Sequence, residues 1–334
     1  MTNLYKHLFL CAVLLVSATI TSCGSSNGNK TKKETQPVVM VQAPDFNADS
    51  AYTYIKNQVD FGPRVPNTKA HKACGNYLAG ELERLGAKVY NQYADLLAYD
   101  GTLLKSRNII GTYNSEQAKR VMLCAHWDSR PYADNDKEKN HRTPIDGAND
   151  GASGVGVLLE IARQIQKQNT SIGIDIIFFD SEDYGTPDFY EGEYKQDTWC
   201  LGSQYWGRFP HVADYKARYA ILLDMVGGKN GRFYYEGYSK RTANFAMNKI
   251  WDIAHASGYA NYFPKKDGGE VIDDHVYVNR YRQIPCVDII HYDHNTGTGF
   301  NPTWHTLKDN MDHIDKATLK AVGQTVMNVI YNEK

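Results

Sequence analysis

The sequence has no marked excess of charge of either sign. Its 37 lysines and arginines nearly balance its 38 aspartates and glutamates, and the formal net charge is −1. A surface that holds nucleic acid or anionic lipid by charge needs a positive excess, which this composition does not supply. We therefore expect no nucleic-acid partner.

Cysteine pairs with the spacing of a metal site are also missing. Two of the six cysteines belong to the N-terminal leader, and the other four are Cys74, Cys124, Cys200 and Cys286. An exported chain could join these four in disulfides. However, Cys124 and Cys286 lie in strand-like apolar runs, where a buried free thiol is equally ordinary. The sequence leaves both possibilities open.

The N-terminus lacks an apolar run of the length that spans a bilayer. The stretch LFLCAVLLV follows Lys6 and is shorter than the roughly 20 residues that a transmembrane helix needs, which favours a signal peptide over residues 1–22. The residues Ile20-Thr21-Ser22-Cys23 resemble the lipobox of bacterial lipoproteins. This resemblance implies cleavage before Cys23 and a durable lipid anchor on that residue. The alternative is an ordinary secretory signal with an incidental cysteine.

A polar segment, GSSNGNKTKKETQP, follows Cys23 and cannot bury apolar surface, so residues 23–44 are expected to form a flexible tether. These features predict an exported protein that is held by lipid in a bacterial cell envelope, in the periplasm or at the outer membrane.

Beyond residue 45 the sequence contains no second linker, repeat or low-complexity stretch, so residues 45–334 are expected to form one domain. Apolar strand-like runs alternate with helical ones. The runs IDIIFF, AILLDM and CVDII carry apolar residues on both faces of the expected strand, as in strands covered by helices on both sides. The pattern predicts a single three-layer α/β/α domain around a mixed, largely parallel twisted sheet.

Ligands of such sheets bind at the carboxyl ends of the strands, and here those ends carry histidines and acids. They are His126, Asp128, Asp150, Glu182, Asp183, Asp224 and His305. A single polar side chain at a strand end is usually a cap or a surface group. A whole set at one sheet edge, with imidazole and carboxylate together, indicates a zinc site.

The order of these residues is similar to that of the zinc-dependent aminopeptidase superfamily, whose two-metal members use one aspartate to bridge both ions. Two further segments are more specific. The stretches VIDDHVYVNRYRQIPCVDII and FNPTWHTLKDNMDHID resemble the animal-type glutaminyl-peptide cyclotransferases. These relatives use a single zinc ion and convert N-terminal glutamine of peptides and proteins to pyroglutamate with loss of ammonia.

The cyclase resemblance implies a role for each matching residue. Zinc would be bound by Asp150, Asp183 and His305, where Asp183 stands in place of the glutamate of many relatives. Glu182 would carry the proton between the α-amine and the leaving ammonia. The resemblance implies hydrogen bonds from Glu182 to its catalytic partners and a small pocket for the glutamine side chain. The catalytic partners are Asp273 and Asp224, and the pocket residues are Trp304 and Phe300.

Several alternatives remain. One zinc ion is expected, but two are not excluded, because a second metal set of His126, Asp150 and Asp224 is complete. His126 and Asp128 are otherwise interpreted as a structural pair. Trp304 and Phe300 are also compatible with simple packing, and Asp273 with a helix cap. The competing functions are a two-zinc aminopeptidase and an inactive fold used for binding. The intact ligand set argues against the latter.

Overall fold

The computed structural model describes residues 41–193 and 195–333. The predicted signal peptide, Cys23 and most of the predicted tether therefore lie outside the described residues. Helices and strands alternate along the chain, as the sequence pattern predicts. The elements are α1 (Ala48–Val59), α2 (Lys69–Arg84), β1 (Lys88–Leu97), β2 (Leu103–Tyr113), β3 (Arg120–His126), η1 (Glu138–Asn140), α3 (Ala152–Lys167), β4 (Gly173–Phe179), α4 (Leu201–Arg208), β5 (Ala220–Asp224), α5 (Gly237–Thr242), α6 (Asn244–Ala256), α7 (Asp274–Arg282), β6 (Cys286–Ile290), η2 (Met311–His313) and α8 (Lys316–Tyr331).

The six strands form one mixed sheet in the order β1-β2-β4-β3-β5-β6. Strand β3 pairs in parallel with β4 and β5, and β5 pairs in parallel with β6. Strand β2 runs antiparallel to both β1 and β4. The predicted fold class, an α/β domain around a mixed and largely parallel sheet, is confirmed.

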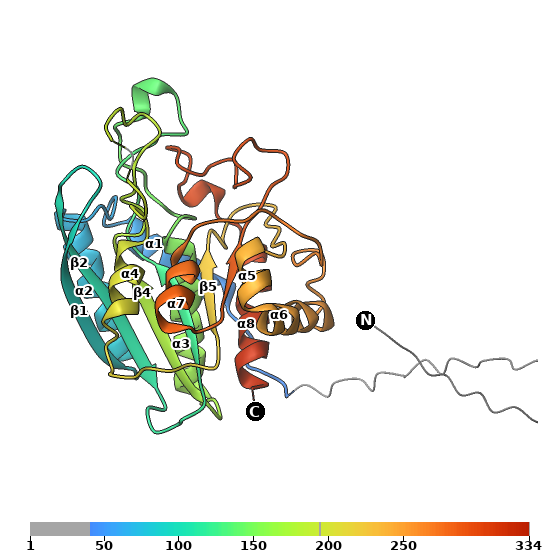
Figure 1. Cartoon of the computed structure of the whole chain (residues 1–334). Coiled ribbons are helices and arrows are strands. Elements are labelled where there is room, and N and C mark those ends of the chain that lie inside the picture. Colours follow the sequence, from blue (N-terminus) through green and yellow to red (C-terminus); the bar gives the residue numbers. More distant parts are fainter. Residues whose placement is uncertain (1–40, 194, 334) are drawn as a thin grey trace, which may run out of the picture. The chain divides into compact units, whose positions relative to one another are not determined.

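Helices cover both faces of this sheet (Figure 1). Helices α1, α2, α3 and α8 belong to one layer, with α6 packed against α8, whereas α4 and α7 pack together on the other face. In β4, Ile176 and Phe178 join the first layer's core, and Ile177 and Phe179 join the second. Burial on both faces is the reason that the central strands are apolar at consecutive positions.

The packed domain begins earlier than the sequence pattern suggests. The Val41 backbone exchanges two hydrogen bonds with the side-chain amide of Asn332 at the end of α8. The Phe46 N–H donates to Gln324 Oε1 at 2.8 Å, and the Phe46 ring is buried against α8. Residues 41–44, which we assigned to the tether, are therefore anchored on α8. Among the described helices, none has the length and apolarity to cross a bilayer.

The sheet topology brings the carboxyl ends of β3, β4, β5 and β6 to one edge. Strand β3 ends on His126 and β5 ends on Asp224, while the segment after β4 carries Asp180, Glu182 and Asp183. Because parallel strands end at the same edge, acids and histidines that are far apart in the chain become neighbours there.

Candidate active site

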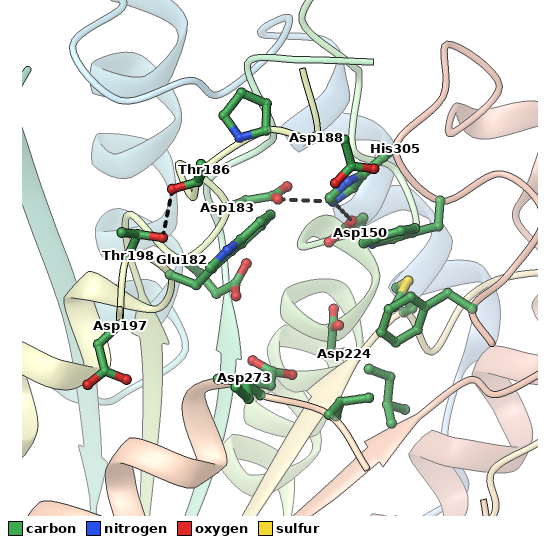
Figure 2. A pocket seen from close by; sticks show the side chains of 18 of the residues that line it. Asp150, Glu182, Asp183, Thr186, Asp188, Asp197, Thr198, Asp224, Asp273 and His305 are labelled. Carbon is green, nitrogen blue, oxygen red and sulfur yellow. Dashed lines mark hydrogen bonds and ion pairs between the residues drawn. The ribbon is translucent and has the colours of Figure 1, made fainter. Parts of the chain in front are cut away.

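Three side chains of metal-ligand type meet above this edge of the sheet. Asp150 precedes α3, Asp183 follows β4, and His305 lies in the long segment between β6 and η2. His305 Nε2 lies 3.3 Å from Asp183 Oδ1 and 3.7 Å from Asp150 Oδ2, and all three residues are buried (Figure 2). The structure thus brings together the three residues that were predicted to bind the metal.

A tight turn before α3 presents Asp150. Gly151 has a φ of 87°, and a Cβ there would lie 2.6 Å from the Asp128 carbonyl oxygen, so only glycine fits. Asp309 accepts the backbone N–H groups of Asn149 and Asp150 at 2.7 and 3.0 Å. Burial raises the pKa of Asp309 to about 7. Sequence reasoning missed Asp309, although it lies in the cyclase-like segment that contains His305.

His305 is held by a carboxylate on its other ring nitrogen. His305 Nδ1 lies 3.1 Å from Asp134 Oδ1, and Asp134 forms a buried ion pair with Arg130. Although burial opposes ionisation, hydrogen bonds from Arg130 and His305 hold the pKa of Asp134 well below its usual range. Arg130 Nη1 also donates to the Asp183 carbonyl oxygen at 2.9 Å. Neither Arg130 nor Asp134 ends a strand, so the sequence carried no signal that pointed to them.

This arrangement fits a bound cation. Because His305 Nδ1–H donates to Asp134, the Nε2 lone pair faces the carboxylates of Asp150 and Asp183. Asp183 Oδ2 is buried without a hydrogen-bond partner. An ion held between these groups would remove the repulsion between the two carboxylates and would satisfy the unpartnered Asp183 oxygen. Ligand atoms of a tetrahedral zinc ion lie roughly 3.3 Å apart, close to the observed separations, and two carboxylates with one imidazole suit zinc.

His126 forms a second group with two acids. Its Nε2 lies 3.0 Å from Asp150 Oδ1 and 3.3 Å from Asp224 Oδ1, and these three residues are the other predicted metal set. Burial lowers the pKa of His126, but hydrogen bonds with Asp128, Asp150 and Asp224 outweigh it and raise this pKa well above its usual value. A proton on His126 Nε2 is therefore sufficient to satisfy the carboxylates of Asp150 and Asp224. A second cation in place of that proton would do the same.

Asp128 interacts more closely with the backbone of Glu182 and Asp183 than with His126. Its two oxygens accept the backbone N–H groups of Glu182 and Asp183, each at 3.1 Å, whereas His126 Nδ1 is 3.5 Å away. Ser181, just before these acids, has a φ of 55°, which non-glycine residues seldom adopt. The strained turn and the Asp128 carboxylate together aim Glu182 and Asp183 into the site.

Glu182 is buried at the floor of the pocket. Burial raises its pKa well above the usual value, and the charges of Asp273 and Asp183 add to the effect of burial, while His126 opposes it. The Cys200 thiol donates to Glu182 Oε1 at 3.1 Å. Sequence reasoning missed this contact, because Cys200 lies in a loop with no metal or nucleophile spacing.

The partners of Glu182 differ from those that the cyclase resemblance implied. Within the described chain, no hydrogen bond joins Glu182 to Asp273 or Asp224; Asp224 bonds to His126 instead. The Asp273 carboxylate lies close to both Glu182 and Cys200, and its Oδ2 is buried without a partner. Burial raises the pKa of Asp224 to about 7. The charges of Asp150 and Asp273 act in the same direction, and the hydrogen bond with His126 opposes them. These carboxyl groups therefore interact through their charges.

Asp273 is also the N-cap of α7, so the alternative of a helix cap describes the same residue. Glu236 anchors the segment around Asp273. Its carboxylate accepts hydrogen bonds from the backbone N–H groups of Tyr238, Ser239 and Val271, and it lies 3.1 Å from His275 Nε2. Burial opposes the Glu236 charge, but His275 and the backbone donors hold the pKa of Glu236 at about 2.

His275 Nδ1 faces a second carboxyl group, that of Asp288, at 3.7 Å. Burial raises the pKa of Asp288 well above its usual value. Glu236 lies outside every motif of the sequence. Asp288 and His275 lie in the cyclase-like stretch VIDDHVYVNRYRQIPCVDII, but nothing in that stretch indicated that they pair with each other or with Glu236.

The acids open into a pocket of about 440 Å³. Trp304 stacks on His305 with ring centroids 3.7 Å apart, and Phe300 lies 4.6 Å from Trp304. Both line this pocket, and their contact with a glutamine side chain stays a prediction. The loop after Asp183 covers one side, and its lining residues are Thr186, Pro187, Asp188, Lys195, Asp197, Thr198 and Trp199 (Figure 2).

The disulfide question that the sequence left open also has an answer: Cys74, Cys124, Cys200 and Cys286 are free thiols, and all four are buried.

Comparison with known proteins places these residues in a family context. Residues 108–330 match the model of peptidase family M28. The aminopeptidase YwaD of Bacillus subtilis is 25% identical over 82% of this chain, and the match spans about half (55%) of YwaD. A glutaminyl-peptide cyclotransferase of Dictyostelium discoideum is 23% identical over 77% of each chain.

Solved structures are more similar. A Bacteroides thetaiotaomicron glutaminyl cyclase bound to N-acetylhistamine is 65% identical, covers 88% of this chain and 100% of its own, and has a TM-score of 0.86. The Tannerella forsythia glutaminyl cyclase is 60% identical, covers 87% of this chain and 100% of its own, and also has a TM-score of 0.86. The predicted resemblance to the zinc aminopeptidase superfamily and to glutaminyl cyclases is confirmed.

Proposed function

The chain belongs to peptidase family M28, and we propose that it cyclises the N-terminal glutamine of peptides and proteins to pyroglutamate with release of ammonia. The observation that carries this proposal is the 65% identity to a glutaminyl cyclase over 88% of the chain. The site supports it, because a buried carboxyl group with a raised pKa lies beside a cation-binding group in a small pocket.

Asp150, Asp183 and His305 are the residues that would hold zinc. A zinc ion bound there supplies Lewis-acid polarisation of a carbonyl oxygen, here that of the substrate γ-carboxamide. Asp134 keeps His305 in the tautomer whose Nε2 is free for the ion.

Glu182 carries the proton in the proposed reaction. The substrate α-amine attacks the γ-carboxamide carbon of the same residue, so a C–N bond forms within one molecule and proximity supplies much of the rate. Glu182 accepts the proton that the amine loses and donates it to the nitrogen that leaves as ammonia, when the old C–N bond breaks. A carboxyl group whose pKa is raised well above its usual value is better suited to both transfers than an ordinary carboxyl group.

The walls of the pocket set the position of the glutamine. Trp304 and Phe300 offer flat apolar surfaces beside His305, and Asp273 and Asp224 present carboxyl groups to the same pocket. The acids attract the positively charged N-terminus of the substrate before it loses its proton. The charge of Asp273 also raises the pKa of Glu182 and the pKa of Asp224, which supports a role for Asp273 in the proton transfer.

A two-metal aminopeptidase is the second candidate. It is favoured by the complete set of His126, Asp150 and Asp224, and by the similarity to the B. subtilis aminopeptidase. In that reaction a water molecule attacks a peptide carbonyl and a free amino acid is released. Metal content separates the candidates in part: one ion per chain supports the cyclase proposal, and two support the peptidase.

The decisive test is incubation with a peptide that begins with glutamine. Cyclisation releases ammonia and leaves the peptide bonds intact, whereas aminopeptidase action releases free glutamine. A chelator should abolish the activity and added zinc should restore it. Release of free glutamine as the main product would overturn the cyclase proposal.

A Glu182→Gln variant tests the proton transfer separately. Gln keeps the size of the side chain but cannot exchange a proton, so we expect turnover to fall by at least about 100-fold. Zinc content should be unchanged, because Glu182 is not one of the three proposed ligands. Near-normal turnover with zinc bound would remove Glu182 from the mechanism.

We also propose that the mature protein is anchored by lipid on Cys23 in the cell envelope. The support is the lipobox-like Ile20-Thr21-Ser22-Cys23 and the polar segment that follows it. A chain of this kind reaches substrates outside the cytoplasm, such as exported proteins and peptides that begin with glutamine.

A further inference from the structure

A second cavity, of about 520 Å³, lies between α2 and the strands β1 and β2. It shares no lining residue with the pocket that contains the acids. Its charged rim is formed by Lys72, Lys105 and Arg107, and its apolar surfaces are those of Tyr93, Leu103 and Trp127. No role in the proposed reaction uses any of these side chains.

The charge of this second cavity is opposite to that of the first. Three cationic side chains line it, and no aspartate or glutamate does. Lys72 Nζ has no hydrogen-bond or ion-pair partner in the part of the chain that the structure describes. The Arg107 guanidinium donates to the side-chain amide oxygens of Asn91 and Asn76, which are neutral. Lys105 pairs with Asp95 at 2.7 Å, but both side chains are more than half exposed, so this pair is weak.

The body of the cavity is apolar. Leu103 and Tyr93 are 46% and 66% exposed, and the Arg107 guanidinium lies 5.3 Å from the Tyr93 ring. The Trp127 ring forms part of the lining, and a Cβ on Gly75 would lie 3.0 Å from this ring. The absence of a side chain at Gly75 therefore lets α2 approach Trp127. Flat apolar walls below a cationic rim are complementary to a molecule with an apolar body and one anionic end.

We propose that this cavity is a binding site for a small organic anion with an aromatic or aliphatic body. The anionic group is held between Lys72, Lys105 and Arg107, and the apolar body covers Leu103 and the ring of Tyr93. Binding gains from burial of these exposed apolar side chains and from contact with Lys72 and the Arg107 guanidinium, which lack anionic partners among the described residues.

The floor of this cavity is joined to the segment that carries the catalytic acids. His71, which also lines the cavity, lies with Nε2 at 2.9 Å from both oxygens of Asp180, and the Arg107 N–H donates to Asp180 Oδ2 at 2.6 Å. The backbone N–H of Trp127 donates to the Phe179 carbonyl oxygen at 3.0 Å. A ligand in the cavity thus contacts residues that hold Asp180, two positions before Glu182.

The proposal is tested by measuring the binding of 3-phenylpropane-1-sulfonate to the zinc-loaded protein. Calorimetry and ligand-observed NMR report this binding. A sulfonate is a weak zinc ligand, so it avoids the first pocket, and neutral 3-phenylpropan-1-ol is the matched probe without charge. The variant Lys72→Glu/Lys105→Glu reverses the rim. The control Lys69→Glu/Lys88→Glu makes the same change of charge at exposed lysines of α2 and β1 that do not line the cavity.

We expect saturable binding of the sulfonate to the wild type and to the control. Binding should be at least about tenfold weaker in the rim variant, because two attractive contacts become repulsive. The alcohol should bind at least about fivefold more weakly than the sulfonate, with the same affinity for all three proteins. Absence of sulfonate binding to the wild type, equal binding to both double variants, or equal binding of sulfonate and alcohol would each overturn the proposal. Because the readout is binding, the result is independent of the proposed cyclase activity.

Discussion

Replacement of Glu236 by glutamine should cost the folded protein a large part of its stability. The Glu236 carboxylate is buried and is surrounded by three backbone N–H donors and His275. A pKa lowered from 4.5 to about 2 corresponds to roughly 3 kcal/mol of preferential stabilisation of the charged form in the folded state. Glutamine keeps one acceptor oxygen but turns an NH₂ group toward these donors, so about this much should be lost at pH 7.

The loss should depend on pH with a definite sign. Because the folded-state pKa of Glu236 is depressed, its contribution is fully present above the unfolded-state pKa of about 4.5. It is lost as the pH falls toward about 2. The difference in unfolding free energy between wild type and Glu236→Gln should therefore be constant from pH 8 to about pH 5.5. Below that, the difference should shrink as the solution becomes more acidic.

Urea unfolding of the two zinc-loaded proteins at a series of pH values measures this difference directly. Effects of pH on metal binding are common to both proteins and cancel. Glu270→Gln is the matched control, since Glu270 lies nearby on the surface in an exposed pair with Arg241, and it should leave the unfolding curve unchanged. A loss below about 1 kcal/mol for Glu236→Gln, or one that grows toward acidic pH, would refute the reasoning.

Three further predictions concern the site and the leader. Asp134→Asn should weaken zinc binding by about 10- to 100-fold in a chelator competition, because His305 loses the carboxylate that orients it; unchanged affinity would contradict this role. Cys200→Ala should move the acidic limb of the kcat/KM pH profile to higher pH, because Glu182 loses a donor to its charged form, while Cys200→Ser should retain the wild-type profile. Cys23→Ser should shift the protein from the membrane fraction to the soluble fraction, and persistent membrane association would exclude the lipid anchor.

The layered fold and the carboxyl edge of its sheet could be predicted, because the pattern of apolar residues along each segment indicates which faces are buried. The run GIDIIFF in β4 is buried at every position, and that requirement is visible as a sequence that is apolar except at Asp175, whose carboxylate pairs with Arg120. The residues of the proposed metal site could be predicted because Asp183 follows a recognisable strand, Asp150 lies in a glycine-rich turn before a helix, and His305 lies in a family-like segment. The start of the domain could not be located in this way. Residues 41–44 are held by the side chains of Gln324 in α8 and of Asn332 at its end, a contact between the two ends of the domain.

The sequence by itself determined the α/β class, the edge at which chemistry occurs, and the identity of the acids and histidines that meet there. Only the tertiary structure decided which partner each of them has. Asp224 bonds to His126 and not to Glu182, the Cys200 thiol reaches Glu182, and Asp134 orients His305. The physical reason is that secondary structure follows from neighbours along the chain. Hydrogen bonds and pKa values depend on distances of a few ångströms between residues that only the packed sheet and loops bring together.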